Sequence, residues 1–252
     1  MCDCGQRHSA PGFSSLLPSA EYTRRQWLRG ATASIAAGLS LSHPILGWAD
    51  NPAPSAPPLT PAQALQRLQA GNARYVAGKP TQRQPLAQRT NLTRGQWPYA
   101  AILSCADSRV PPELVFDAAE GELFVVRLAG NIASAEALAS LEYAVHVLHV
   151  PCIVVMGHSQ CGAIAATVHQ LQSGANLPGQ LPSLTQAITP ALQKLHAQDP
   201  AQRLAQATAL NVQHQVQQLR GAAPIVAPAV ASGQLHIHGS VCDLASGRVN
   251  WL

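Results

Sequence analysis

The sequence predicts an α/β fold in which a mainly parallel β-sheet is flanked by helices. Short apolar runs bounded by loop residues are typical of the buried strands of such a sheet. The chain has four of them, at residues 100–104, 123–127, 152–156 and 234–241. Between them, apolar residues recur at helical spacing near residues 134–149 and 203–219. This alternation of strand and helix is typical of a parallel sheet.

Polar residues directly follow two of these predicted strands. Cys105, Asp107 and Arg109 come after the first run, and His158 and Cys161 come after the third. Open α/β sheets place their sites at the carboxyl ends of the strands, so we expect these side chains to meet there. Two thiolates and one imidazole, with a fourth position open, are typical of a catalytic zinc site. A lone buried cysteine is more often a core residue, so the cluster carries the prediction.

A helix is predicted to begin directly after Thr60. Thr60 can cap the helix, Pro61 suits its first position, and Gln63 can reach back to the Thr60 backbone. The apolar side of this helix is expected to consist of Leu65, Leu68 and Tyr75.

Residues 1–49 have the pattern of an export signal. Arg24 and Arg25 stand in a segment, residues 23–29, that resembles the twin-arginine pattern, and a weakly apolar segment follows it. Small residues at positions 47 and 49 favour cleavage after Ala49, which predicts a periplasmic protein. A chance Arg-Arg pair in a disordered tail is the alternative. The apolar segment is too short and too rich in Gly, Ala and Ser for a stable membrane anchor.

The mature chain is expected to be one domain at residues 60–252, preceded by a Pro- and Ala-rich linker at residues 50–59. Roughly 200 residues are enough to bury one substantial core. Residues 50–252 keep 12 of the 16 Lys and Arg residues and 10 of the 12 Asp and Glu residues, which leaves a net charge of +2. This charge and the lack of a basic stripe give no indication of nucleic-acid binding.

Two motifs give the chain a specific family resemblance. The first covers residues 105–111 (Cys-Ala-Asp-Ser-Arg-Val-Pro), and the second covers residues 157–162 (Gly-His-Ser-Gln-Cys-Gly). Together with residues 124–127 and 129–131, they make the chain similar to the β-class carbonic anhydrases from about residue 61 to residue 252. The chain departs from this pattern at residues 118–122, where many relatives have Gln-Gly-Leu-Gly-Asp and this sequence has Ala-Ala-Glu-Gly-Glu.

The resemblance implies a role for eight residues, position by position. They are the Zn²⁺ ligands Cys105, His158 and Cys161, the dyad Asp107 and Arg109, and the substrate-pocket residues Gln96, Phe124 and Tyr143. These pocket residues match the plant-like subtype, whose site is accessible, whereas the other subtype is regulated by bicarbonate. In this family the N-terminal helix forms an arm that embraces a partner subunit, so the resemblance also implies a homodimer or a higher homo-oligomer.

The implied function is the zinc-dependent, reversible hydration of carbon dioxide to bicarbonate and a proton by a zinc-bound hydroxide. Asp107 can accept a hydrogen bond from that hydroxide, or it can ligate the metal and close the site. Arg109 can hold the carboxylate in a bidentate pair, which would keep it off the metal. One alternative is a zinc hydrolase of carbon disulfide or carbonyl sulfide. Another is a non-catalytic protein that binds zinc or bicarbonate, and the Asp107–Arg109 pair argues against it.

The remaining candidates are weaker. A helix is expected to start near Gln160, to lower the pKa of Cys161 through its amides, and to use Gly162 for a close backbone approach. Cys152 and Cys242 are expected either to form a disulfide or to stay as buried thiols. His236 and His238 share one strand face, and a structural role is favoured for both. No proton-transfer residue is assigned among His146, His149 and His169.

Overall fold

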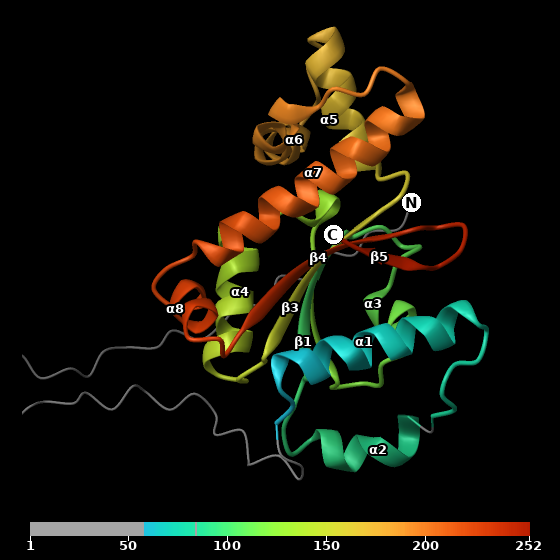
Figure 1. Cartoon of the computed structure of the whole chain (residues 1–252), viewed down its shortest axis with the longest axis vertical. Helices are drawn as coiled ribbons and strands as arrows, with labels where there is room; N and C mark the ends of the chain where they lie inside the picture. The colour runs from blue at the N-terminus through green and yellow to red at the C-terminus, as the bar shows by residue number, and fades with distance from the viewer. Residues whose placement is uncertain (1–57, 84) are drawn as a thin grey trace, which may run out of the picture. The chain divides into compact units, whose positions relative to one another are not determined.

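The computed structural model of the chain describes residues 58–83 and 85–252, with only the backbone described for residues 85–88. The predicted signal peptide at residues 1–49 lies outside these residues, as does most of the predicted linker at residues 50–59. Within the described part, the chain forms a five-stranded sheet with helices packed on both of its faces (Figure 1).

The sheet has the strand order β2–β1–β3–β4–β5, and β5 alone runs antiparallel to its neighbour among these strands. The strands are β1 (Ala100–Ser104), β2 (Leu123–Arg127), β3 (Cys152–His158), β4 (His236–Cys242) and β5 (Val249–Trp251). The predicted α/β fold with a mainly parallel sheet is therefore confirmed. β5 has no counterpart among the predicted strands, because three residues are too few to show a two-residue period.

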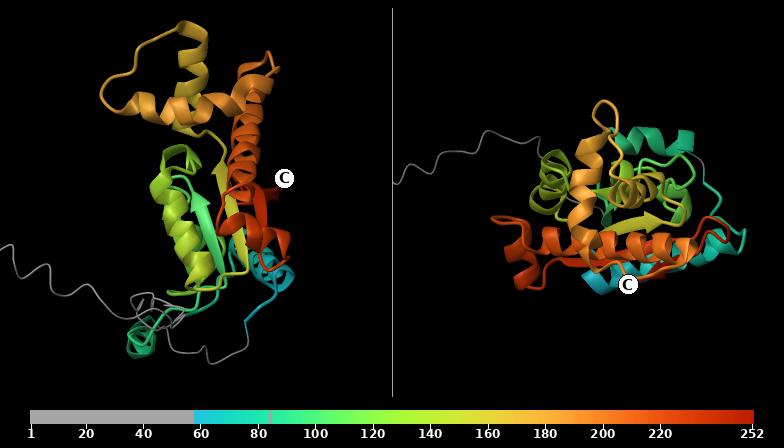
Figure 2. Two further views of the ribbon diagram at one scale, coloured as in Figure 1. Left: turned by 90° about the vertical axis from the view of Figure 1, so that its left-hand side faces the viewer. Right: turned by 90° about the horizontal axis from the view of Figure 1, so that it is seen from above.

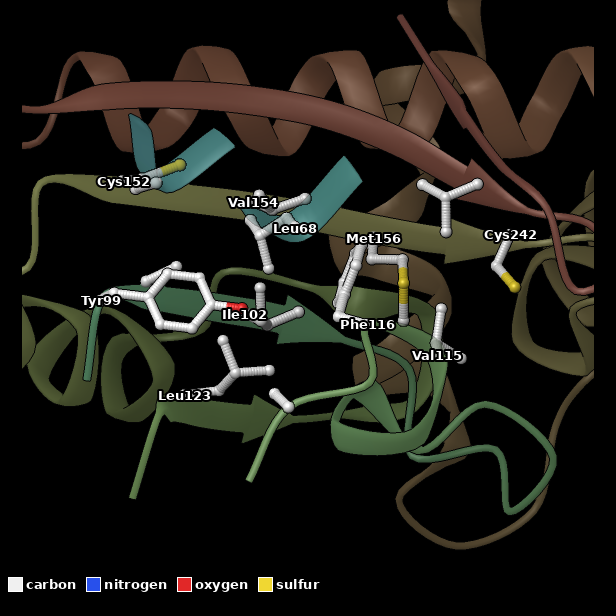
Figure 3. Packing of buried hydrophobic residues seen from close by; sticks show 14 of the residues in the cluster. Leu68, Tyr99, Ile102, Val115, Phe116, Leu123, Cys152, Val154, Met156 and Cys242 are labelled. Carbon is white, nitrogen blue, oxygen red and sulfur yellow. The ribbon is translucent and has the colours of Figure 1, made fainter. Parts of the chain in front are cut away.

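One face of the sheet packs against α1 (Pro61–Val76) and α3 (Pro112–Val115). Leu68 of α1, Phe116 just after α3, and Met156 of β3 are buried together in this core (Figure 3). The layer is apolar from the amino ends of the strands to their carboxyl ends, so it gives the sheet a rigid base.

The opposite face is covered by α4, α7 and α8, whose apolar side chains form a second core cluster with β1, β3 and β4. Beyond the carboxyl ends of the strands, α5, α6 and the 3-10 helix η2 pack together with α7 (Figures 1 and 2). The bounds of these elements are α4 (Ala135–His146), α5 (Gly162–Ser173), α6 (Leu181–Ile188), η2 (Thr189–Lys194), α7 (Pro200–Arg220) and α8 (Val226–Ala231). Two short helices, α2 (Pro85–Leu92) and the 3-10 helix η1 (Ala129–Asn131), complete the described part.

The predicted helices exist, with shifted ends. α4 starts after its capping residue Ser134 and ends at His146, three residues before the predicted end. α7 starts three residues earlier than predicted, because Asp199 caps it by accepting a hydrogen bond from the Gln202 amide at 2.9 Å. In residues 58–83 and 85–252, no helix has both the length and the apolar character of a membrane span.

The start of α1 has the predicted capping box, but its buried side differs from the prediction. The Thr60 hydroxyl accepts from the Gln63 amide at 3.3 Å, and the Gln63 side chain accepts from the Thr60 amide at 2.9 Å. The buried residues of the helix are Ala64, Leu68, Gly71 and Asn72, whereas Tyr75 is 37% exposed.

The close approach of α1 to the turn after α3 explains this difference. A Cβ atom at Gly71 would lie 1.8 Å from the carbonyl oxygen of Phe116, so the contact requires glycine. Small residues therefore line the contact, and Tyr75 lies outside it. The helical period alone could not show which side of the helix meets a backbone segment.

Candidate metal centre

The structure brings Cys105, His158 and Cys161 together at the carboxyl end of the sheet. Cys105 follows β1, His158 is the last residue of β3, and Cys161 is the N-cap residue of α5. One ligand atom from each residue lies within 4.8 Å of the others, and the two sulfur atoms are 4.0 Å apart. All three residues are buried. Among residues 58–83 and 85–252, no other group of three or more His, Cys, Asp or Glu residues is placed to hold a metal ion.

The imidazole of His158 is oriented for metal binding. Its Nδ1 atom lies 2.9 Å from the carbonyl oxygen of Ser159, which assigns the proton to Nδ1. The Nε2 atom is buried and has no hydrogen-bond partner within the described residues. A buried ring nitrogen without a partner is costly, and a cation between it and the two sulfur atoms would satisfy it. The residues present therefore fit a metal ion.

The two thiols titrate as a pair. The hydrogen bond from Cys161 lowers the pKa of Cys105 to about 4, with burial opposing the shift. The same contact raises the pKa of Cys161, and burial raises it further. The prediction that the amides of α5 lower the pKa of Cys161 is confirmed, although their effect is not the largest one. The amides of Ala163 and Ile164 do lower it, but the Cys105 sulfur outweighs them. A dication between the sulfur atoms would favour the thiolate form of both.

The helix after the second motif begins at Gly162, two residues later than predicted. Gln160 has a φ of 57°, which is left-handed and cannot continue into a helix. The role predicted for Gly162 was wrong, because a Cβ atom there would meet nothing within 4 Å in the described chain.

Asp107 and Arg109 form a bidentate ion pair beside the cluster of Cys105, His158 and Cys161. The Arg109 Nε and Nη2 atoms donate to the two Asp107 carboxylate oxygens at 2.8 and 2.7 Å, and the Arg109 amide donates at 3.0 Å. These hydrogen bonds hold the pKa of Asp107 well below its usual range. Asp107 Oδ2 lies 3.7 Å from Nε2 of His158, so the carboxylate borders the cluster. The pair can therefore present a fixed hydrogen-bond acceptor at the open side of the cluster.

Arg127 holds the backbone of the first motif, a role that the sequence analysis did not assign. Its Nε atom donates to the carbonyl oxygen of Cys105 at 3.0 Å, and its Nη2 atom donates to that of Asp107. Arg127 is the last residue of β2 and pairs with Ser104 of β1. A cation at the end of a neighbouring strand was the signal that could have identified it.

A chain of buried amides on α7 supports the Cys105 sulfur. The Gly130 amide donates to Cys105 Sγ at 3.4 Å, and the Gly130 carbonyl accepts from Asn211 Nδ2 at 2.9 Å. Gln215 Nε2 donates to Asn211 Oδ1 at 3.1 Å, and Gln215 Oε1 accepts from the Ala133 amide at 2.9 Å. Asn211 and Gln215 are 0% and 1% exposed. Two amide side chains, four residues apart on the buried side of α7, were the available sequence signal.

The three predicted pocket residues do not reach this cluster within one chain. Phe124 and Tyr143 contact each other, with ring centroids 6.1 Å apart. Phe124 pairs with Ala101, four residues before Cys105, which places it roughly 13 Å along the strand from the cluster. Gln96 precedes β1 and also lies towards the amino ends of the strands.

Cys152 and Cys242 do not form a disulfide. Both are free and buried. They lie at opposite ends of β3 and β4 (Figure 3), because Cys152 pairs with His236 and Cys242 pairs with His158. Six residues of strand separate them by roughly 20 Å, whereas a disulfide needs Cα atoms within about 7 Å. Of the two states expected for these cysteines, the structure shows buried thiols.

His236 and His238 lie side by side on β4, with ring centroids 6.1 Å apart. His238 also makes an edge-to-face contact with Trp251 at 6.3 Å. Burial lowers the pKa of His238 and favours its neutral form. In the described part of the chain, neither histidine belongs to a metal-binding group of three.

Comparison with known proteins identifies the family. The family model described as carbonic anhydrase matches residues 100–249. The carbonic anhydrase of Mycolicibacterium smegmatis is 39% identical over 194 residues, which are 77% of this chain and 94% of that protein. Carbonic anhydrase 2 of Mycobacterium tuberculosis is 37% identical over 193 residues, which are 76% of this chain and 93% of that protein.

Solved structures give the same result for the fold. A tetrameric β-carbonic anhydrase of Sordaria macrospora superposes with a TM-score of 0.61 at 27% identity, covering 76% of this chain and 94% of the other. The Coccomyxa β-carbonic anhydrase in complex with acetazolamide gives a TM-score of 0.59 at 28% identity, covering 76% and 82%. The chain belongs to the β-class carbonic anhydrase family of enzymes.

Proposed function

We propose that this enzyme catalyses the zinc-dependent, reversible hydration of carbon dioxide to bicarbonate and a proton. The observation that carries the proposal is the Asp107 carboxylate, held by Arg109 beside the cluster of Cys105, His158 and Cys161. A closed structural metal site needs four protein ligands and no oriented acceptor next to them. Here three ligands and one positioned carboxylate leave room for a reacting molecule.

The donor set favours zinc over other divalent cations. Thiolate and imidazole ligands suit Zn²⁺, whereas Mg²⁺ and Ca²⁺ prefer oxygen ligands. Bound at this site, Zn²⁺ would supply the Lewis acidity that converts water into a nucleophile at moderate pH. The two sulfur ligands would donate more charge to the cation than imidazoles do, so we expect turnover to rise into the alkaline range.

Asp107 is the residue that orients the nucleophile. The low pKa of its carboxyl group keeps it ionised throughout the working pH range, so it can accept a hydrogen bond and cannot donate one. Arg109 occupies one side of both carboxylate oxygens, which fixes their direction. This arrangement supports an accessible site, with Asp107 bound to Arg109.

A second copy of the chain would supply the apolar wall of the substrate pocket. Phe124, Tyr143 and Gln96 lie too far from their own metal cluster, so they can line a pocket only at the cluster of another copy. The relative from Sordaria macrospora is tetrameric, which supports a homo-oligomer. Trp97, which precedes β1 at the same end of the sheet, is 36% exposed and would be covered in such an assembly.

The twin-arginine pattern at Arg24 and Arg25 supports export to the periplasm. In cells, the double substitution R24K/R25K should retain the protein in the cytoplasm. Equal periplasmic recovery of the unsubstituted protein and the variant would rule out this route.

The test of the proposed function is stopped-flow carbon dioxide hydration by protein of known metal content. We expect about one zinc per chain, fast hydration, and loss of hydration after chelation, with activity restored by zinc. Bound zinc with no hydration at neutral or alkaline pH would overturn the proposal. Carbon disulfide and carbonyl sulfide, assayed in parallel, test the hydrolase alternative. Hydration that appears only at alkaline pH would indicate that Asp107 closes the site at neutral pH.

A further inference from the structure

We propose that a cavity near the amino ends of β1 and β2 binds the phosphate group of a small phosphorylated molecule, away from the metal centre. The cavity has a volume of about 340 Å³, which is at the lower end of the range for small-molecule sites. Nine residues form its wall, and they come from α1, from the loop after it, from the position before β1 and from the turn before β2. They are Arg67, Arg74, Thr81, Gln82, Arg83, Tyr99, Asp117, Ala119 and Glu122.

The charges of this wall favour an anion. Three arginines face two carboxylates, which leaves an excess of one positive charge. Arginine guanidinium groups bind phosphate through parallel hydrogen bonds that lysine cannot reproduce. A divalent cation is disfavoured, because both carboxylates are already paired with arginines.

Two of the arginines are held in place by a single buried carboxylate. Asp117, whose side chain is 1% exposed, accepts from Arg74 Nε at 2.5 Å and from Arg83 Nη1 at 2.6 Å. The Thr81 hydroxyl donates to the same carboxylate at 2.8 Å. One carboxylate cannot neutralise two guanidinium groups, so the pair keeps a net positive charge in a fixed geometry.

Donor atoms remain available on this preorganised pair. The bond from Arg74 to Asp117 uses Nε alone, and the two Nη atoms of Arg74 have no hydrogen bond to any residue that the structure describes. The side chain of Arg74 is 41% exposed, so a ligand in the cavity can reach these atoms. A phosphate group offers the acceptor oxygens that the free end of this guanidinium lacks.

Arg67 is the third arginine of the wall, and its ion pair with Glu122 can be exchanged for a contact with a bound anion. Its guanidinium lies 4.2 Å from the centroid of the Tyr99 ring, and it pairs with Glu122. Glu122 also accepts from the Ala119 amide at 2.7 Å. Ala119 and Glu122 belong to residues 118–122, the segment in which the sequence departs from the family pattern. The side chain of Glu122 therefore competes with any anion for Arg67.

Within one chain, the cavity is separate from the metal centre. Tyr99 immediately precedes β1 and Cys105 immediately follows it, so roughly 20 Å of strand lie between them. The effects of substitutions at Arg67 and Glu122 on phosphate binding can therefore be interpreted independently of the metal ligands of the same chain.

The test is isothermal titration of the zinc-loaded, full-length protein with inorganic phosphate at constant ionic strength. We expect saturable binding of one phosphate per chain, and weaker binding of acetate, which carries one charge. R67Q should weaken phosphate binding about tenfold, because one charged hydrogen bond is lost. E122Q should strengthen it several-fold, because the competing carboxylate is removed. Arg74 and Arg83 are left unchanged, since they also hold Asp117.

R94Q is the matched control, because Arg94 is an exposed arginine that does not line the cavity. It should leave phosphate binding unchanged, and all three variants should keep the thermal stability and the carbon dioxide hydration of the unsubstituted protein. The absence of saturable binding at millimolar phosphate would overturn the proposal. Phosphate binding that is equal in R67Q, E122Q and the unsubstituted protein would also overturn it, because the anion would then bind elsewhere. Acetate binding as tight as phosphate binding would contradict the proposed ligand class.

Discussion

The three candidate metal ligands at the carboxyl end of the sheet are buried, whereas the side chains of two arginines of the cavity at its amino end are exposed. At the carboxyl end, Cys105, His158 and Cys161 are 5%, 0% and 1% exposed. At the amino end, the side chains of Arg67 and Arg74 are 46% and 41% exposed. In the dry site each contact is strong and each missing partner is costly, whereas salt screens the interactions of the open site. One scaffold thus serves both a reaction centre and an electrostatic binding surface.

The groups that hold the functional side chains in place also differ between the two ends of the sheet. The Cys105 sulfur depends on a buried series of neutral amides that reaches from η1 to α7. The arginines of the cavity depend on one carboxylate, Asp117. A substitution at the carboxyl end should therefore change the metal site itself, whereas a substitution of Asp117 at the amino end should change stability and leave the metal site unchanged.

Cys161→Ala should abolish stoichiometric metal binding, because it removes one of three ligands from a buried site. Zinc content after gel filtration should fall from about one per chain to nearly zero, and hydration activity should fall with it. Cys152→Ala is the matched control, since Cys152 is also a buried free thiol but lies at the other end of the sheet. The control should keep its zinc. Full zinc content in Cys161→Ala would show that the cluster is not the metal site.

Asp107→Asn should retain zinc and lose about 10²- to 10³-fold in turnover, the size of effect typical of a lost preorganised electrostatic contact. The amide keeps the shape of the carboxylate but cannot form the charged pair with Arg109. Hydration should be measured by stopped flow on samples of equal zinc content. Loss of zinc together with activity would instead identify Asp107 as a metal ligand.

Asp117→Asn should destabilise the protein by about 2 kcal/mol at pH 7. Burial alone would raise the pKa of Asp117, but the hydrogen bonds from Arg74, Thr81 and Arg83 outweigh it and hold the pKa well below its usual range. Because the folded pKa is below the unfolded one, the stabilisation is present above about pH 4 and is lost as the pH falls through the folded value. The difference in unfolding free energy between the two proteins should therefore shrink on acidification.

Urea unfolding at pH 7 and at lower pH values, at one protein concentration, measures this difference. Asp199→Asn is the control, because Asp199 caps α7 from an exposed position and asparagine caps a helix about equally well. It should show almost no change. A destabilisation of Asp117→Asn that is independent of pH would mean that packing, and not charge, is the contribution of Asp117.

The metal cluster could be predicted from the sequence because its members follow strands directly. A parallel sheet brings the carboxyl ends of its strands to one edge, so Cys105 and His158 had to lie close together. The capping box at Thr60 was equally local, and the structure has it. Strand and helix positions followed from the apolar periodicity, with errors of a few residues at the ends.

The parts that could not be predicted depend on contacts between distant segments. In the sequence, Asn211 and Gln215 are only polar positions on a predicted helix. The packing of α7 against η1 connects them to Cys105 through Gly130. The cavity joins the end of α1 to two loops, residues 77–83 and 116–122, that no sequence period connects. Tyr75 was placed on the wrong side of its helix, because the contact at Gly71 is made by backbone and not by side chains.

The smallest expected effect tests whether the buried amides act on the metal site or only on stability. Asn211→Leu removes the hydrogen bond to the Gly130 carbonyl, so the Gly130 amide should no longer hold the Cys105 sulfur in place. Losing an outer hydrogen bond of this kind costs about 10-fold in metal affinity, which competition with a chelator can measure. In the cobalt-substituted protein, the sulfur-to-metal charge-transfer band should shift.

Asn72→Leu provides the comparison. Asn72 is also a buried asparagine, but it binds the Val115 and Gly247 carbonyls and the Val249 amide on the α1 side of the sheet. Its substitution should lower the unfolding free energy and leave the cobalt spectrum unchanged. If Asn211→Leu also lowered stability without moving the charge-transfer band, the amides of α7 would be purely structural. The contrast between the two ends of the sheet would then rest on burial alone.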